Sequence, residues 1–259
     1  MLIVLGKYNI IIYFCTMKRI FFLLCYFFTL VAVESCTDIK QYDFSKVWMS
    51  HQDCTFGYMG VNYQRLYVHF DSITKQSDVD YKVYGKMKYR DSIFLFKGEA
   101  LVVSVVENVE LVEGLDGEGS MQKCEVKSDW LLHVIGGKAE EKGDITGSMI
   151  SYFDMQTDTP HFFDYNLSYC DGFRNNQFVG EYKDAQDKQI TQSVCWGAFR
   201  IPNCGDLDVG AGEFSPNEKY LPYGWRSYYE AQTIGTEDVW QIESLPWWKG
   251  ESRSIIIEF

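Results

Sequence analysis

The chain has 259 residues, of which 46% are hydrophobic and 23% are charged, a globular composition that argues against extended disorder. Its length suffices for one large domain or two small ones. Residues 1–35 carry Lys7, Lys18, Arg19 and Glu34, so their removal changes the net charge from −12 to −14. Such an acidic chain argues against nucleic acid or anionic lipid as a partner.

The N-terminal segment has the pattern of an export signal. A basic start at Met17-Lys18-Arg19 is followed by an almost unbroken apolar run of 14 residues, Ile20–Val33. A membrane-spanning helix needs about 20 residues, so this run suits a cleaved signal better than an anchor. Met17 is therefore the expected first residue. In the alternative, Ile3–Val33 forms one uncleaved membrane helix, in which Lys18 and Arg19 would be costly.

The end of this segment, Val33-Glu34-Ser35-Cys36, resembles the lipobox of bacterial lipoproteins. Val33 and Ser35 fit that motif, whereas Glu34 stands where the family prefers a small or aliphatic residue. The resemblance implies cleavage before Cys36, palmitate-type acylation of that cysteine and attachment of the exported protein to the cell envelope, at the outer membrane. The alternative is an ordinary cysteine beside a cleavage site. Residues 36–55, polar and irregular, are expected to form a tether.

From Phe56 onward the pattern alternates with period two, which predicts strands with one buried face. In Arg65–Asp71, Leu66, Val68 and Phe70 share one face. Tyr81–Arg90 repeats the pattern. Further strands are expected at Ile93–Phe96, Glu99–Val106, Trp130–Ile135, Asp144–Phe153, His161–Leu167, Phe178–Tyr182 and Ile190–Phe199.

These strands predict an all-β fold, an antiparallel meander over residues 56–202, with no long helical segment. Glycines recur in or beside the strands, where close backbone approach or a sharp bend is needed. The candidates are Gly85, Gly98, Gly147, Gly180 and Gly197. This spacing resembles lipocalin-like up-and-down barrels, which implies closure as a barrel. A β-sandwich is the alternative.

Residues 203–259 change character, being rich in Gly, Tyr, Pro and Asp before two apolar runs, Val239–Ile242 and Ile255–Ile257. We expect a long loop followed by closing strands. A separate domain of this size would bury little core.

Carboxylates alternate in the glycine-rich start of this region. Asp206, Asp208 and Glu213 are candidate ligands for a hard cation such as Ca²⁺. They are also the candidate carboxylates of a glycan hydrolase. A solvated acidic turn is the simpler interpretation.

Tryptophans gather near the C-terminus. Trp225, Trp240, Trp247 and Trp248 are candidate stacking residues for a sugar or apolar ligand. In the alternative they seal the core of the β domain.

Five cysteines remain once Cys36 and the leader cysteines are set aside. Cys195 and Cys204 are the closest candidates for a disulfide, which export would permit. Cys170 with Cys195 is the competing pair, and buried reduced thiols are the other alternative.

No catalytic motif occurs in the sequence, so no catalytic residue and no cofactor is assigned. The favoured function is a non-enzymatic binding module, held on a membrane by its lipid, for a glycan, lipid or apolar small molecule. An envelope structural or protein-interaction lipoprotein and a glycan hydrolase are the alternatives.

Overall fold

The computed structural model describes residues 42–113, 120–136, 141–164, 171–235, 243 and 245–249, all within one unit of the chain, residues 39–259. These residues form an all-β fold with short helices. The strands are β1 (Thr55–Met59), β2 (Gln64–Lys75), β3 (Asp80–Tyr89), β4 (Ser92–Glu113), β5 (Ser120–Ile135), β6 (Glu141–Gln156), β7 (Thr159–Phe162), β8 (Asn175–Asp184) and β9 (Thr191–Ala198). The helices are α2 (Ser45–Met49), η1 (Gln52–Cys54), η5 (Glu218–Tyr223), α3 (Arg226–Ile234) and η6 (Trp247–Lys249).

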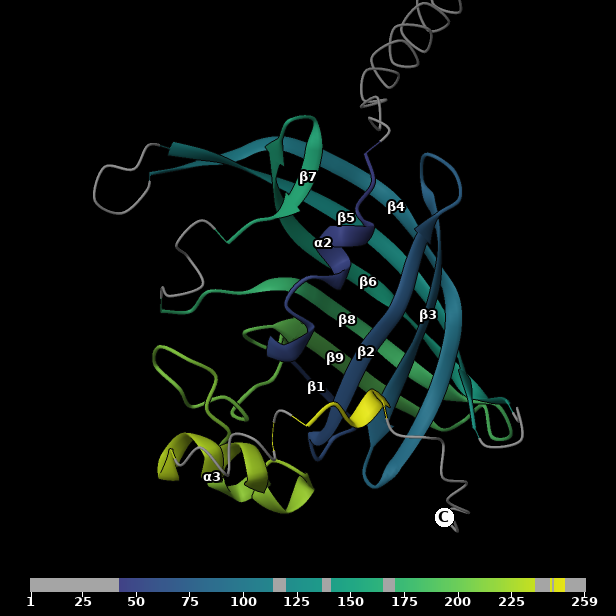
Figure 1. Ribbon diagram of the computed structural model, residues 1–259. Coiled ribbons are helices and arrows are strands. Elements are labelled where there is room, and N and C mark those ends of the chain that lie inside the picture. Colours follow the sequence, from purple (N-terminus) through teal and green to yellow (C-terminus); the bar gives the residue numbers. More distant parts are fainter. Residues whose placement is uncertain are drawn as a thin grey trace, which may run out of the picture. The chain divides into compact units, whose positions relative to one another are not determined.

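The strands form one curved antiparallel sheet (Figure 1). Its order is β5-β4-β3-β2-β1-β9-β8-β6-β7, and a further pairing of β5 with β6 closes eight strands into a ring. β7 pairs with the end of β6 that lies beyond β8. The ring confirms the antiparallel all-β fold. Both a barrel and a flattened, sandwich-like arrangement are compatible with this strand order.

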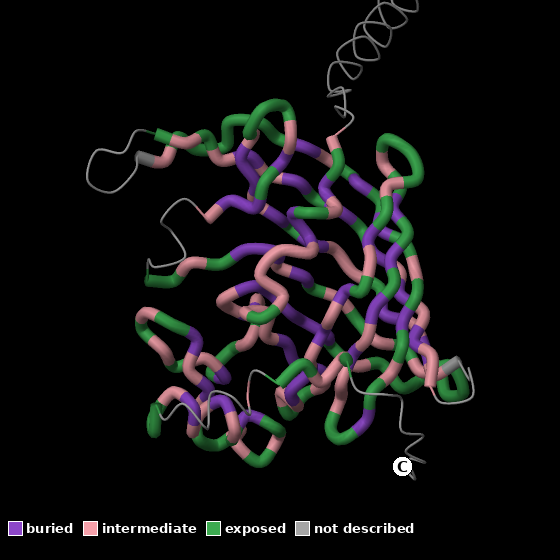
Figure 2. Tube along the Cα trace, viewed as in Figure 1, coloured by how far each residue is buried: buried purple, intermediate pink, exposed green. Residues whose placement is uncertain are grey.

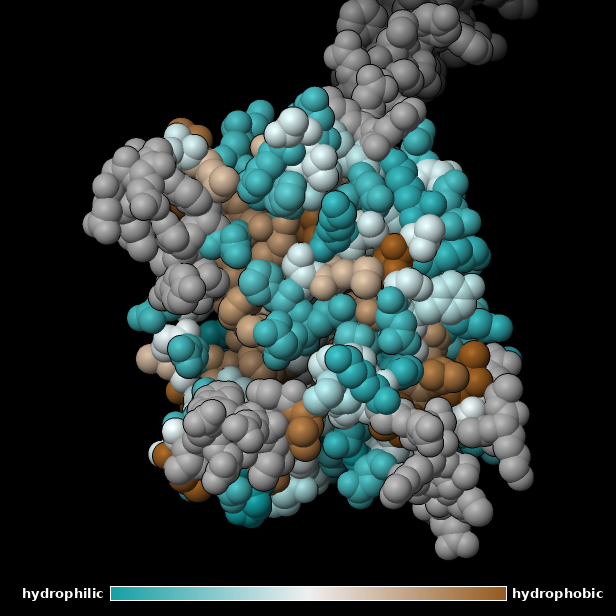
Figure 3. All heavy atoms as spheres, viewed as in Figure 1, coloured by the Kyte–Doolittle hydropathy of each residue, from teal (hydrophilic) through white to brown (hydrophobic). Residues whose placement is uncertain are grey.

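Side-chain alternation fills the ring. In β2, Leu66, Val68 and Phe70 are buried inside it, as their period-two spacing predicts. Figure 2 shows the same alternation of buried and exposed residues along the other strands. In Figure 3, which shows one face of the molecule, hydrophobic residues gather left of the centre and again at the lower right, with hydrophilic residues between and above them.

β4 is one strand of 22 residues, although the sequence predicts two shorter strands there. Lys97 and Gly98, which separate the predicted strands, continue the pairing with both β3 and β5. At Gly98 a Cβ atom would lie 1.9 Å from the carbonyl oxygen of Leu131, so glycine is needed for close approach of β5.

The predicted tether is wrong for residues 42–55, because this segment enters the ring. Phe44, Val47 and Trp48 of α2 and its N-cap are at most 2% exposed. The Trp48 ring lies edge-on to Tyr81 and Trp130, with centroids 4.7 and 5.2 Å apart. Three large apolar side chains within five residues therefore make α2 a plug of the core. The lipobox and residues 36–41 lie outside the described residues.

Two side-chain amides complete the strand ladder. Gln52 accepts from the backbone N–H of Phe70 at 2.6 Å and donates to its carbonyl at 3.2 Å. Asn175 makes the same pair of bonds with Tyr152, at 2.7 and 2.8 Å. Because buried backbone groups must be paired, these amides replace the ladder bonds that the neighbouring strands do not provide.

Residues 201–235 pack on the outer face of β1 and β9. Tyr58 and Cys195, which point away from the ring interior, join Leu207, Phe214 and Trp225 in a second apolar cluster. The segment forms loops, η5 and α3, a helix that the sequence did not predict. The closing strands expected at Val239–Ile242 and Ile255–Ile257 lie outside the described residues. None of the helices in the described ranges is long and apolar enough to cross a membrane.

Candidate functional site

A pocket of about 390 Å³ lies outside the ring, between β1, β2 and the chain that follows β9. We call it the outer pocket. Its volume falls within the usual range for small-molecule sites, about 300–1,000 Å³. Its lining includes Asp53, Cys54, Arg65, Tyr67, Arg200, Glu213, Tyr228, Glu243, Trp247 and Trp248.

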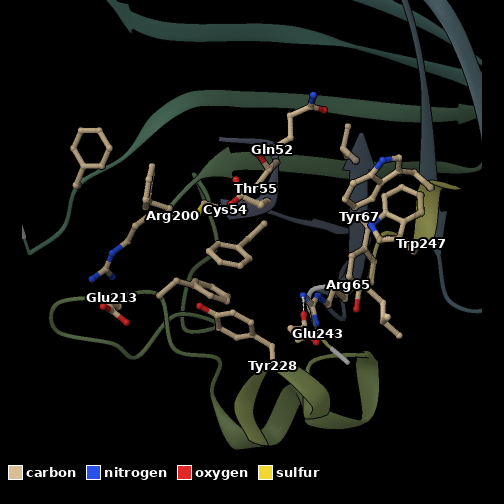
Figure 4. A pocket seen from close by; sticks show the side chains of 18 of the residues that line it. Gln52, Cys54, Thr55, Arg65, Tyr67, Arg200, Glu213, Tyr228, Glu243 and Trp247 are labelled. Atoms are coloured by element: carbon tan, nitrogen blue, oxygen red, sulfur yellow. Dashed lines mark hydrogen bonds and ion pairs between the residues drawn. The ribbon is translucent and has the colours of Figure 1, made fainter. Parts of the chain in front are cut away.

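The wall of the outer pocket comes from the strand alternation of β2. Because Leu66 and Val68 point into the ring, Arg65, Tyr67 and His69 lie on the opposite face. Arg65 and Tyr67 line the pocket, and His69 lies beneath Trp248. In Figure 4, Arg65, Tyr67, Glu243 and Trp247 lie on one side of the pocket, and Arg200 and Glu213 on the other.

Arg65 is a buried cation, only 5% exposed. Its Nη2 donates to a carboxylate oxygen of Glu243, which is 9% exposed. The guanidinium carbon lies 4.2 Å from the ring centroid of Tyr67, 5.1 Å from that of Trp225 and 5.5 Å from that of Tyr228. Nη1 has no hydrogen-bond partner among the described residues. Since an unpaired buried donor costs about 1–3 kcal/mol, Nη1 is a position where a bound acceptor would be favoured.

Two phenols border this cation. Burial raises the pKa of Tyr67, with Arg65 acting against the rise and Glu243 adding to it. Burial likewise raises the pKa of Tyr228, against the opposing effect of Arg65 and with the help of Glu213. Both hydroxyls therefore stay protonated at neutral pH, and that of Tyr228 already accepts from Nε2 of Gln232 at 3.3 Å.

Trp247 and Trp248, two of the candidate stacking residues, form the aromatic rim of the outer pocket. The Trp247 ring lies edge-on to Tyr67, with centroids 5.9 Å apart. Trp248 stacks on His69 at 4.3 Å and an interplanar angle of 17°. Burial is the main reason that the pKa of His69 is lowered, with Asp71 opposing it, so the stacked imidazole is neutral at pH 7. Both tryptophans are half-buried and present aromatic surface to the pocket.

Trp225, by contrast, is not a ligand platform. It is 0% exposed, and its Nε1 donates to the carbonyl of Tyr63 at 2.8 Å. The predicted role is wrong because the indole belongs to the apolar cluster between β1 and α3. Trp240 lies outside the described residues.

The predicted cation site is not assembled. Asp208 pairs with Arg200 at 2.6 Å and accepts from the backbone N–H groups of Gly210 and Ser215. Asp206 instead pairs with Lys219 and accepts from Tyr220. No group of three His, Cys, Asp or Glu side chains that could hold a metal occurs among the described residues. Of the three predicted carboxylates, only Glu213 lines the outer pocket.

The predicted disulfide between Cys195 and Cys204 is not formed, because both are free thiols. Burial raises the pKa of each thiol. Both pack in the apolar cluster outside β1 and β9, which agrees with the alternative of buried reduced cysteines. Cys36 and Cys170 lie outside the described residues.

A second cavity, of about 480 Å³, occupies one end of the ring. It lies between the turns that join β3 to β4 and β8 to β9, and its lining is mainly apolar, with Met59, Met87, Phe94 and Val134. Tyr182 also lines this cavity, and its hydroxyl already donates a hydrogen bond to the carbonyl of Lys142 at 2.6 Å. Of these two cavities, the outer pocket is the one whose described lining includes a buried polar group without a partner.

Sequence reasoning missed the polar centre of the outer pocket, Arg65 and Glu243, and the phenols Tyr67 and Tyr228. The alternation of β2 does predict that Arg65 faces away from the core. It does not predict that Trp225, Tyr228 and Glu243 then pack against the guanidinium. Glu243 follows Arg65 by 178 positions, and no local pattern relates the two.

Comparison with known proteins found no matching family model, no matching curated protein and no matching solved structure.

Proposed function

We propose that this protein is an exported lipoprotein, attached to the cell envelope through a lipid on Cys36, whose folded body binds a carbohydrate in the outer pocket without catalysing a reaction. The export part of the proposal is supported by the signal-like segment and the lipobox-like residues before Cys36. The observation that carries the binding part is Nη1 of Arg65, which has no partner in the described part of the chain and lies beside the aromatic rim of Tyr67, Trp247 and Trp248.

A carbohydrate fits this combination better than a lipid does. Sugar rings present an apolar face that stacks on tryptophan and an edge of hydroxyl groups that accept and donate hydrogen bonds. A lipid tail would leave Nη1 unpaired and would gain nothing from a buried charge. The phenol of Tyr67, held protonated, adds a further polar group to the pocket lining.

The hydrolase alternative gains little support. Asp206 is paired with Lys219 and Asp208 with Arg200, so neither is available as an acid or a nucleophile in the outer pocket. Glu213 is the one predicted carboxylate that remains there. A purely structural lipoprotein would need no unpaired donor in a pocket and is the outcome if no ligand binds.

A glycan array probed with the full-length protein, purified from membranes in detergent, tests the binding proposal. We expect a restricted set of bound glycans, and a loss of about tenfold or more in affinity for Trp247→Ala and for Arg65→Lys. Arg65→Lys keeps the positive charge beside Glu243 but removes the forked donor geometry. Tyr84→Ala, an aromatic residue 50% exposed on β3, is the matched control and should bind as the wild type does. Absence of any bound glycan, or equal binding by Trp247→Ala, would contradict the proposal.

Metabolic labelling with a palmitate analogue tests separately whether the protein carries a lipid on Cys36. Wild-type protein should be labelled and Cys36→Ser should not. Absence of label on the wild-type protein would contradict the proposal that it is a lipoprotein, and would not affect the proposal that it binds a carbohydrate.

A further inference from the structure

Two arginines with unused donors line the outer pocket from different parts of the chain. Arg65 lies on β2, and Arg200 follows β9. Nη1 of Arg200 pairs with Asp208 and with the carbonyl of Gly210, and Nη2 donates to the carbonyls of Ala211 and Gly212. Its Nε is buried and has no partner among the described residues, as is true of Nη1 of Arg65. A bound molecule that satisfies both arginines therefore supplies at least two acceptors.

These arginines do not make the outer pocket positive. The charge of Arg65 is matched by Glu243, and that of Arg200 by Asp208. Two further carboxylates, Asp53 and Glu213, line the same pocket and are exposed, and neither pairs with a cation among the described residues. Among the lining residues, the charge left without a counter-charge is therefore negative.

The negative charge of these carboxylates also acts on their neighbours. Burial raises the pKa of the Cys54 thiol to about 11, and Asp53 adds to the rise. Glu213 adds to the rise in the pKa of Tyr228 that burial causes. Both carboxylates thus disfavour additional negative charge inside the outer pocket, and a ligand carboxylate would meet the same field.

We infer that the outer pocket selects an uncharged saccharide, rather than a uronic acid or other anionic sugar, which rests on the proposed function and names its ligand class. Ring or acetamido oxygens accept from Nη1 of Arg65 and Nε of Arg200. Sugar hydroxyls donate to the carboxylates of Asp53 and Glu213. A neutral polyol provides acceptors for the two arginines and donors for the two carboxylates without adding charge.

The test compares sugars that share a ring and differ only at C6. Saturation-transfer NMR titrations of the full-length protein would use glucose with glucuronate, galactose with galacturonate and mannose with mannuronate. We expect the preferred neutral sugar to bind about tenfold more tightly than its uronate. In Glu213→Gln the affinity for the uronate should rise about fivefold relative to the affinity for its neutral parent, at low salt. Glu181→Gln, an exposed carboxylate on β8 outside the pocket lining, is the matched control and should leave the ratio unchanged.

A wild-type protein that binds a uronate as tightly as its neutral parent would overturn the inference and leave carbohydrate binding standing. An unchanged ratio in Glu213→Gln would do the same, because the carboxylate would then not set the selectivity. Failure of every sugar to bind, neutral or acidic, would overturn the proposed function itself. The three results are distinguished within one titration series.

Discussion

Arg65 shows how a single residue can be placed against its own preference. A guanidinium that is 5% exposed has lost its hydration, and its pairing with Glu243 offsets that loss only in part. Buried ion pairs are often no more stabilising than apolar residues of the same size. The retained charge and the open Nη1 therefore suit binding better than stability. Sequence alternation predicts the direction in which Arg65 points, but not the cover that buries it.

Tyr81 gives a pH-dependent test at the same scale. Its hydroxyl donates to the carbonyl of Tyr42 at 2.9 Å and accepts from the backbone N–H of Phe44 at 3.2 Å. Burial is the main cause that raises the pKa of Tyr81 from 10.0 to about 12, with the bond from Phe44 acting against it. The folded state therefore holds this proton more tightly than the unfolded chain does. Stability from this group is complete below pH 10 and is lost as pH rises toward 12.

Tyr81→Phe should accordingly be about 1 kcal/mol less stable than wild type at pH 8, because the two hydrogen bonds are lost. This difference in unfolding free energy should shrink by about 1 kcal/mol by pH 11. At that pH the unfolded wild-type chain has lost the Tyr81 proton that the folded state keeps, which lowers the stability of the wild type alone. Urea unfolding at pH 8, 9, 10 and 11 measures both values. A gap that stays constant across this series would contradict the assignment of the raised pKa to Tyr81.

At the scale of elements, the β-strands were predictable and the pieces that plug and cover them were not. The alternation of hydrophobic and polar residues in Arg65–Asp71 and Tyr81–Arg90 matches β2 and β3, because each strand has one face in the core. The five-residue α2 is too short for helical periodicity to be recognised, and its residues read as a polar tether with isolated aromatics. α3 likewise covers only nine residues, of which two are buried.

The role of α2 as a plug predicts a large effect at Trp48. Trp48→Ala should destabilise the protein by about 3–5 kcal/mol, because the indole fills the space between Tyr81 and Trp130. Trp247→Ala, which removes a half-buried indole from the pocket rim, should cost less than about 1 kcal/mol. Chemical denaturation of the two variants compares them directly. Equal losses would contradict the placement of α2 inside the ring.

The glycine prediction can be tested in β4. Gly98→Ala would force a Cβ against the backbone of Leu131 and should cost about 1–3 kcal/mol. Gly136→Ala is the control, since its Cβ would meet the flexible end of the Lys142 side chain, 2.6 Å away. Thermal unfolding should separate the two variants by several degrees. A Gly98→Ala protein as stable as Gly136→Ala would mean that β4 and β5 approach less closely.

At the scale of the whole molecule, the meander order follows from chain order and short turns, and it was accessible from the sequence. The pairing of the first strand, β1, with the last, β9, could be expected only because the sequence resembles lipocalin-like barrels. The candidate site was the least accessible part. It combines β1, β2, the loop after β9 and residues near position 245, and each contributes side chains whose local sequence gives no sign of a common pocket. Trp247 and Trp248 were found because aromatic clustering is visible in sequence. Arg65, Arg200 and Glu243 were not, because their roles depend on burial.

The most direct measurement is a side-chain NMR spectrum of the isotope-labelled full-length protein, recorded with and without a saccharide that it binds. Binding in the outer pocket predicts shifts of the indole N–H signals of Trp247 and Trp248 and of the guanidinium signals of Arg65. The indole signals of Trp48 and Trp196, in the ring core, should stay in place. Shifts confined to the methyl groups of Met59 and Met87, in the cavity at the end of the ring, would contradict the assignment of the binding site to the outer pocket.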